Sequence, residues 1–125
     1  MPPTREGARK VLAVLDDLLF TVKINEAAKR AGVAVHFVKS EPDALLQAAE
    51  APALIIIDLN CTVLDPLRLI RELKSRDDLK QISLLGYVSH VEGERKRAAQ
   101  QAGCDQVLPR SAFSQNLIRI LQRHK

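Results

Sequence analysis

Carboxylates follow two apolar runs of the chain, at the point where each run ends. Residues 54–57 read Leu-Ile-Ile-Ile and lead to Asp58, and residues 11–15 read Val-Leu-Ala-Val-Leu and lead to Asp16 and Asp17. Short β-branched runs of this kind are typical of strands buried on both faces of a parallel sheet. Because ligands bind outside the carboxyl ends of such strands, we expect the three carboxylates to share one acidic pocket.

Clustered carboxylates repel one another unless a cation or a shared proton compensates their charge. Magnesium is the natural cation, since it binds through one or two carboxylates together with water and a phosphoryl group. A carboxylate can also attack phosphorus and form an aspartyl phosphate. Alternatively, Asp16 or Asp17 caps the helix that follows, and the pair alone does not decide between these interpretations. Asp58 favours the pocket, because a helix cap needs no second acid on another strand.

The acids are positioned by a strict alternation of strands and helices. Gly32 and Gly103 suit left-handed helix ends, Ser40 can cap a helix, and Asp65 precedes a proline at a first helical position. This alternation predicts an α/β fold, a doubly wound parallel sheet in which the first and third strands are neighbours. The expected strands are 10–15, 33–38, 53–58, 82–88 and 105–108, and the expected helices are 18–31, 41–50, 66–76, 92–102 and 112–123.

Length and composition indicate one soluble domain. The chain has 125 residues, of which 46% are hydrophobic and 27% charged, as in ordinary globular proteins. We expect a tail at residues 1–8 and a single domain at 9–125. No run is long enough to span a membrane, the start lacks the apolar core of a signal peptide, and the two cysteines lack metal-ligand spacing. These features predict a cytoplasmic protein with reduced thiols.

The positive net charge raises the question of nucleic-acid binding. The charge is +4, but the basic residues are spread over three expected helices, and aromatic residues make up only 3% of the chain with no tryptophan. A platform on which bases can stack is therefore missing. We expect the basic residues to be solvated helix surface, and neither nucleic acid nor membrane to be a partner.

The chain resembles the receiver domain of two-component response regulators, the CheY-like superfamily, in an atypical or pseudo-receiver form. The resemblance covers residues 9–124 and is carried by the order of elements, the acid pair, the run ending at Asp58, and Ala102-Gly103 before a short fifth strand. It implies a flavodoxin-like sheet of five parallel strands in the order 2-1-3-4-5 with five helices.

The resemblance also implies roles for individual residues. The phosphoacceptor aspartate of the family falls on Asp58, and the residue whose backbone carbonyl helps to bind magnesium falls on Asn60. The acid pair falls on Leu15-Asp16 or on Asp16-Asp17, and counting back from Gly32 favours the first. Asp16, Asp17, Asp58 and Asn60 are thus the expected magnesium ligands, and affinity should be weak if Leu15 replaces an acid.

The chain departs from the family at the positions that sense the phosphate. The switch hydroxyl falls on Val88, with Ser89 one place later, and the lysine falls on Arg110, preceded rather than followed by a proline. Val107 stands where the family places its mobile aromatic residue, although Tyr87 could take that role. Arg110 can still pair with a phosphoryl group through its fork of donors, in a geometry that differs from that of a compact ammonium group.

Two functions follow from the resemblance. The first is a stand-alone receiver in phosphorelay signal transduction: a histidine kinase or phosphotransfer protein phosphorylates Asp58, magnesium neutralises charge, Ser89 and Arg110 contact the phosphate, and a downstream effector protein binds the phosphoprotein. The alternative is a pseudo-receiver, an interaction module that is not phosphorylated. In neither case do we expect an enzyme. A small hydrolase or a nucleotide-binding protein is disfavoured, since no glycine-rich loop follows the first strand.

Overall fold

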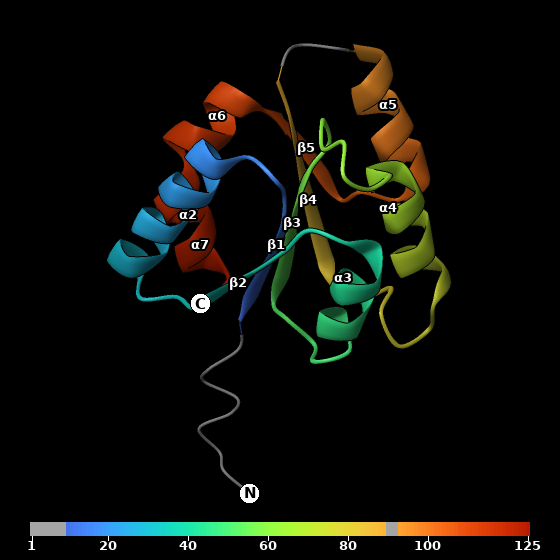
Figure 1. The fold of residues 1–125 in the computed structure, drawn as a ribbon, viewed down its shortest axis with the longest axis horizontal. Helices are drawn as coiled ribbons and strands as arrows, with labels where there is room; N and C mark the ends of the chain where they lie inside the picture. Colours follow the sequence, from blue (N-terminus) through green and yellow to red (C-terminus); the bar gives the residue numbers. More distant parts are fainter. Residues whose placement is uncertain (1–9, 90–92) are drawn as a thin grey trace, which may run out of the picture.

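The fold is a five-stranded parallel sheet between two layers of helices (Figure 1). The computed structural model describes residues 10–89 and 93–125, so the expected tail at residues 1–8 lies outside the described residues. The strands lie in the order β2-β1-β3-β4-β5, which confirms the predicted topology. Their bounds are β1 (Val11–Val14), β2 (Val35–Val38), β3 (Leu54–Asp58), β4 (Ser83–Val88) and β5 (Gln106–Pro109).

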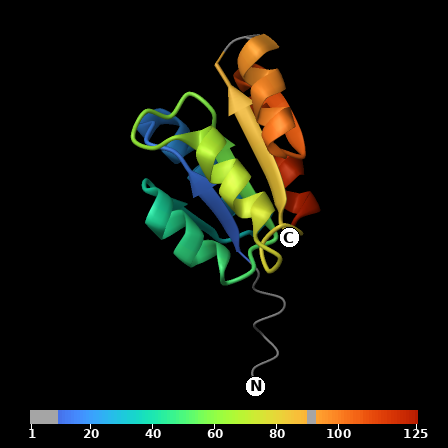
Figure 2. The same cartoon turned by 90° about the vertical axis from the view of Figure 1, so that its right-hand side faces the viewer.

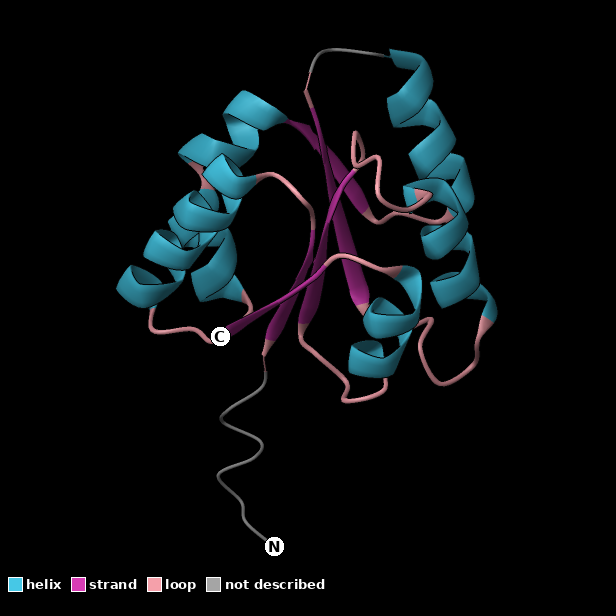
Figure 3. Ribbon diagram, viewed as in Figure 1, coloured by secondary structure: helices cyan, strands magenta, loops and turns pink. Residues whose placement is uncertain are grey.

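The helices divide into two groups, one on each face of the sheet (Figure 3), and Figure 2 looks onto the side that carries α3, α4 and α5. One face is covered by α2, α6 and α7, and the other by α3, α4 and α5. None of the helices in the described part of the chain is long and apolar enough to cross a membrane. Their bounds are α2 (Leu18–Ala31), α3 (Glu41–Ala48), α4 (Pro66–Ser75), α5 (Gly93–Ala102), α6 (Arg110–Gln115) and α7 (Leu117–Arg123).

The last helical segment differs from the prediction of one helix at 112–123. It begins two residues earlier, at Arg110, and Pro109 occupies the capping position without a side-chain cap bond. It is also interrupted at Asn116, whose backbone leaves the helical region with φ −108° and ψ 13°. The Asn116 side-chain amide donates to the Ala112 carbonyl at 2.8 Å, and such local bonds compete with a regular helix. The described residues therefore contain six helices instead of five.

Alternate residues of the central strands fill two separate cores. Ile55 and Ile57 face α3, α4 and α5, whereas Leu54 and Ile56 face α2, α6 and α7, and each of the four is at most 2% exposed. Successive side chains of a strand point to opposite faces, and both faces of this sheet are covered. The continuous apolar run before Asp58 follows from this burial.

The helix caps expected at Ser40 and Asp65 are present, Asp17 also takes the alternative role of a helix cap, and these caps determine where the strand–helix loops turn. Asp17 Oδ1 accepts from the Phe20 N–H at 3.3 Å, and Ser40 Oγ accepts from the Asp43 N–H at 3.2 Å. Asp65 Oδ1 accepts from two N–H groups at the start of α4. At the end of α2, Gly32 adopts the left-handed conformation with φ 72°. These caps satisfy N–H groups that a helix start otherwise leaves unpaired.

Candidate functional site

The carboxyl ends of β1, β3 and β4 meet at one edge of the sheet. Asp58 is the last residue of β3 and pairs in register with Tyr87 of β4, and Ile57 pairs with Val14 at the end of β1. The Leu59 N–H continues this pairing by donating to the Tyr87 carbonyl at 2.9 Å. Parallel register thus places the loop after β1 beside Asp58, as expected from the sequence.

Of the two acids after β1, Asp17 is the one associated with Asp58. Asp17 is half-buried, caps α2, and adds to the rise in the pKa of Asp58. Asp16 is exposed, and its carboxylate lies 3.8 Å from the ammonium group of Lys39. Leu15 still points into the core, so side-chain alternation turns Asp16 to the other side and returns Asp17. Counting back from Gly32 had favoured Asp16 as the acid in register.

The Asp58 carboxylate is largely removed from water, and its neighbours compensate only partly for the lost hydration. Its side chain is 5% exposed, and burial raises the pKa of its carboxyl above the ordinary value. The Asn60 N–H donates to Asp58 Oδ1 at 2.9 Å, and this bond and the nearby Arg110 act to lower the pKa. Burial outweighs them, so the charged form of Asp58 gains from any further cation or donor.

The carboxylates at this edge fit a magnesium site in which the protein supplies only a few of the ligands. Asp17 and Asp58 supply two carboxylates near each other, and magnesium sites commonly use one or two carboxylates with water. Within residues 10–89 and 93–125, no group of three or more histidine, cysteine, aspartate or glutamate side chains is arranged to hold a metal. Most of the coordination shell would therefore have to be water or substrate.

The two positions expected at the switch have different surroundings. Val88 is 2% exposed and packs in the core that faces α3, α4 and α5. Ser89 follows the end of β4, and its backbone N–H donates to Asn60 Oδ1 at 2.7 Å. The loop after β3 and the end of β4 are therefore joined through the Asn60 side chain, and a valine at the end of β4 supplies no hydroxyl.

Arg110 reaches the acidic edge from the first turn of α6. Its guanidinium carbon lies 5.2 Å from the centre of the Phe20 ring, a cation–π arrangement, and its charge acts on Asp58. Its Nε atom is buried and has no hydrogen-bond partner. The guanidinium is thus placed beside the carboxylate cluster with one donor still available.

An aromatic stack beneath the acids was not anticipated from the sequence. The Tyr87 ring contacts both Phe113, with ring centres 4.6 Å apart, and Phe20, with ring centres 5.2 Å apart, and the two phenylalanine rings lie 6.2 Å from each other. The three rings come from β4, α6 and α2, so no spacing pattern within one element reveals them. Aligning the ends of the third and fourth strands would place Val88 beside Asp58, so the register that pairs Tyr87 with Asp58 was also decided by the structure.

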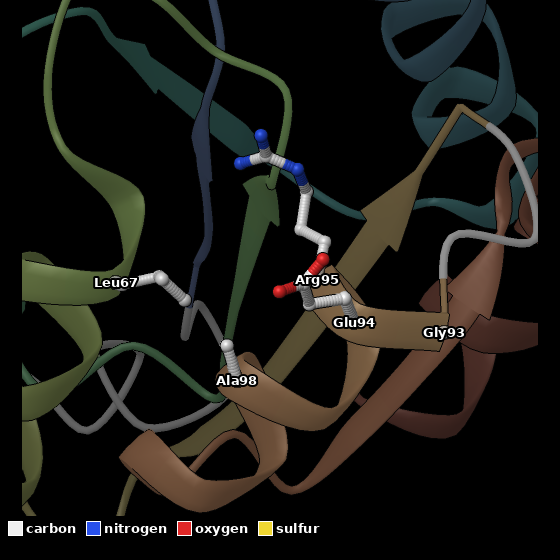
Figure 4. Close-up of a pocket in the computed structure, with 5 residues that line it drawn as sticks. All are labelled: Leu67, Gly93, Glu94, Arg95 and Ala98. Carbon is white, nitrogen blue, oxygen red and sulfur yellow. The ribbon is translucent and has the colours of Figure 1, made fainter.

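Arg95 is a second residue whose role the sequence did not indicate. Its Nη1 donates to the Leu59 carbonyl at 3.0 Å, next to Asp58 in the chain. Figure 4 shows its side chain leaving the start of α5 and extending to the end of a strand. The same residue borders an open hollow of about 610 Å³ between α4 and α5, together with Leu67, Gly93, Glu94 and Ala98. The hollow therefore adjoins the loop after β3.

Comparisons with known proteins place this geometry in a known fold. No protein-family profile and no curated protein matches the sequence. Among solved structures, the chemotaxis response regulator CheY4 of Vibrio cholerae is similar with a TM-score of 0.79 and 24% identity, over 94% of this chain and 98% of that one. A receiver-domain protein of Methanospirillum hungatei is similar with a TM-score of 0.77 and 14% identity, over 92% and 91%.

A third similar structure is the receiver domain of the sensor histidine kinase PA1611 from Pseudomonas aeruginosa, described with a magnesium ion coordinated in its active-site cleft. Its TM-score is 0.80 at 22% identity, over 93% of this chain and 96% of that one. All three likenesses extend over nearly the whole chain, and they agree with the observed strand order. The chain has the CheY-like receiver fold of response regulators.

Proposed function

We propose that this chain is a receiver domain that accepts a phosphoryl group on Asp58 from a histidine kinase or phosphotransfer protein. The observation that carries the proposal is the placement of Asp58: a buried carboxylate at the end of the central strand, with a second acid and an arginine acting on its charge. A structural aspartate on the surface needs none of these neighbours. The receiver fold supplies the context in which such a carboxylate is a phosphoacceptor.

In the proposed step, one carboxylate oxygen of Asp58 attacks phosphorus and forms the new P–O bond. The P–N bond of the phosphohistidine breaks, and its electron pair goes to the imidazole nitrogen, which takes up a proton. Asp58 must be ionised to attack, and the Asn60 N–H and Arg110 favour that form. Arg110 also lies where it can pair with phosphoryl oxygens.

Magnesium belongs to the same proposal. Asp17, Asp58 and the backbone carbonyl of Asn60 would hold it, and it would neutralise charge on the transferring group. Two carboxylates with water suffice for a weak site, and the PA1611 receiver domain offers a precedent in the same fold. Asp16 is engaged with Lys39 and would contribute only through the general negative potential.

The second candidate function is a pseudo-receiver that binds a partner without being phosphorylated. The specific observation in its favour is Val88, which is buried in the opposite core and cannot report a phosphate. In both candidates the domain is a cytoplasmic signalling module rather than an enzyme, and its product is a surface offered to a downstream effector protein.

The deciding experiment is intact-mass measurement after incubation with magnesium and a small phosphodonor. We expect wild-type protein to gain the mass of one phosphoryl group and Asp58→Asn to gain none. The label should be lost in mild alkali or hydroxylamine, as acyl phosphates are. A folded wild-type protein that stays unmodified, while a known receiver in the same tube is labelled, would establish the pseudo-receiver instead.

A further inference from the structure

Tyr87 stands beside Asp58 on the neighbouring strand, and their side chains leave the same face of the sheet. The two residues are register partners in parallel strands, and Tyr87 packs in the core that faces α2, α6 and α7. Its ring is nearly parallel to that of Phe113, with an angle of 5° between the ring planes, and makes an angle of 20° with that of Phe20. Both phenylalanine rings pack against the buried Tyr87 ring and restrict its movement.

The Tyr87 hydroxyl has no partner among the described residues. Tyr87 is fully buried, and its oxygen makes no hydrogen bond. Buried polar atoms in native proteins are nearly always paired, so an exception requires an explanation. Burial raises the pKa of Tyr87, and Asp58 and then Asp17 raise it further. The hydroxyl therefore keeps its proton and is a donor near the acidic end of the sheet.

A second unpaired donor lies beside the first. Arg110 Nε is buried without a partner among the described residues, and the guanidinium lies over Phe20, a ring of the same aromatic cluster. Arg110 acts on the charge of both Asp58 and Tyr87, so both unpaired donors adjoin one carboxylate. A phosphoryl group on that carboxylate would bring three strong acceptor oxygens to this place.

We propose that the Tyr87 hydroxyl, together with Arg110 Nε, donates a hydrogen bond to the phosphoryl group on Asp58, and so supplies the hydroxyl that Val88 lacks. The inference rests on the proposed phosphorylation of Asp58. Its physical reason is alternation along β4: Val88 faces the opposite core, whereas Tyr87 shares the face of Asp58. A donor that is unpaired before phosphorylation and paired after it gives the phosphorylated state an interaction that the free state lacks.

The chain offers a direct reporter, since Tyr87 is its one tyrosine and it has no tryptophan. The probe is beryllofluoride, a stable stand-in for the phosphoryl group, added with magnesium. We expect the near-ultraviolet absorbance of wild-type Tyr87 to shift to longer wavelength on binding, as it does when a phenol donates to an anion. Asp58→Asn should show no shift.

The second arm measures beryllofluoride affinity by fluorine NMR in Tyr87→Phe, which keeps the ring stack and removes only the hydroxyl. We expect affinity about tenfold weaker, at the lower end for a hydrogen bond to a charged acceptor. Thr21→Val is the matched control, because the Thr21 hydroxyl donates to the Asp17 carbonyl at 2.9 Å and not toward Asp58. Its affinity should equal that of wild type.

The outcomes separate this inference from the function on which it rests. If wild type binds beryllofluoride without a shift of the tyrosine band, and Tyr87→Phe binds equally well, the role of Tyr87 is wrong and phosphorylation of Asp58 stands. If wild type neither binds beryllofluoride nor is phosphorylated, both proposals fall together. Should Tyr87→Phe fail to fold, the wild-type absorbance shift alone decides.

Discussion

Asp58 is the only charged side chain that is buried among residues 10–89 and 93–125. The hydrogen bond from the Asn60 N–H and the neighbouring arginine do not fully offset its loss of hydration, so its pKa is raised. A carboxylate in such surroundings weakens the fold whenever it is ionised. The same surroundings make it responsive to a cation or a covalently bound phosphoryl group.

The first prediction concerns Asp58→Asn in metal-free buffer. Asparagine can still accept from the Asn60 N–H and carries no charge, so we expect unfolding at neutral pH to cost about 1 kcal/mol more than in wild type. Because the pKa of Asp58 is raised in the folded state, the wild-type penalty is present above that pKa. As the pH falls through the folded-state pKa toward the ordinary value of 3.8, this destabilisation of the wild type disappears. Urea unfolding across this pH range measures the difference.

The control is Asp77→Asn, an aspartate whose side chain is 97% exposed and which pairs with Lys80. Asp77→Asn should change the free energy of unfolding by only a few tenths of a kcal/mol, as for other surface ion pairs. A large loss of stability in Asp58→Asn would mean that the carboxylate is a structural acceptor, and the interpretation of Asp58 as the centre of the site would fail.

The second prediction compares the adjacent acids. Asp17→Asn should weaken magnesium binding by about tenfold, because one of two carboxylates near the ion is lost. Asp16→Asn should change it by less than about threefold, since an exposed charge is screened by salt. Asparagine also caps helices well, so the cap on α2 survives in the Asp17 variant. Magnesium titration followed by Tyr87 fluorescence measures both, and equal effects would contradict the assignment of Asp17.

At the scale of elements, the strand β4 and the loop after β3 are packed without spare room. A Cβ atom on Gly86 would lie 2.9 Å from Leu59 Cδ1 and 3.0 Å from Leu59 Cγ, and Leu59 is fully buried. Leu59 follows Asp58 directly, and its carbonyl accepts from Arg95. The absent side chain at position 86 therefore determines where the loop beside the acidic edge can lie.

The third prediction follows from this contact. Gly86→Ala should lower the free energy of unfolding by about 1–3 kcal/mol, the usual cost of overpacking a core, and should weaken magnesium binding by displacing the loop. Gly93→Ala is the matched control, because its new methyl group meets only the end of the Arg97 side chain at 3.1 Å. Thermal unfolding of both variants gives the comparison. Equal stability of the two variants would show that Leu59 moves aside freely.

At the scale of the whole molecule, two cores lie on opposite faces of one sheet, and two buried thiols can report how the structure opens. Cys61 and Cys104 are free thiols with side chains 8% and 6% exposed. Cys104 lies between the ends of α5 and β5, where its Sγ donates to the Gln106 carbonyl at 3.3 Å and burial raises the pKa of its thiol. Cys61 lies in the loop after β3.

The fourth prediction is that the two thiols react at different rates with a soluble disulfide reagent. Cys104 should be modified only when the sheet opens, whereas Cys61 should react through local opening of its loop, more than about tenfold faster, since surface loops open at lower free energy than the core. Cys61→Ala and Cys104→Ala each isolate one thiol. Equal rates that follow global unfolding in denaturant would mean that the loop and the sheet open as one unit.

The local features of the fold could be predicted from the sequence because neighbouring residues determine them. The apolar runs predicted all five strands within about two residues, and the caps at Asp17, Ser40 and Asp65 depend on groups only a few positions away. The break at Asn116 escaped prediction because its side-chain bond to Ala112 competes with a pattern that otherwise reads as one helix.

The edge of the sheet at which chemistry is expected was also determined by the sequence. Parallel strands bring their carboxyl ends together, so an acid at the end of the third run must lie near the loop after the first. Which acid of the pair approaches Asp58 was decided by the tertiary structure, because Leu15 packs inward and turns Asp16 toward Lys39. Counting residues back from Gly32 does not show which of the two acids faces Asp58.

The donors around Asp58 were decided only when distant elements packed together. Phe20, Tyr87 and Phe113 come from α2, β4 and α6, and their stack supports the Arg110 guanidinium. Periodic patterns record which face of an element is buried, but they do not record which side chains of different elements touch. The sequence therefore determined the sheet and the position of Asp58, and close packing of residues far apart in the chain decided what surrounds its carboxylate.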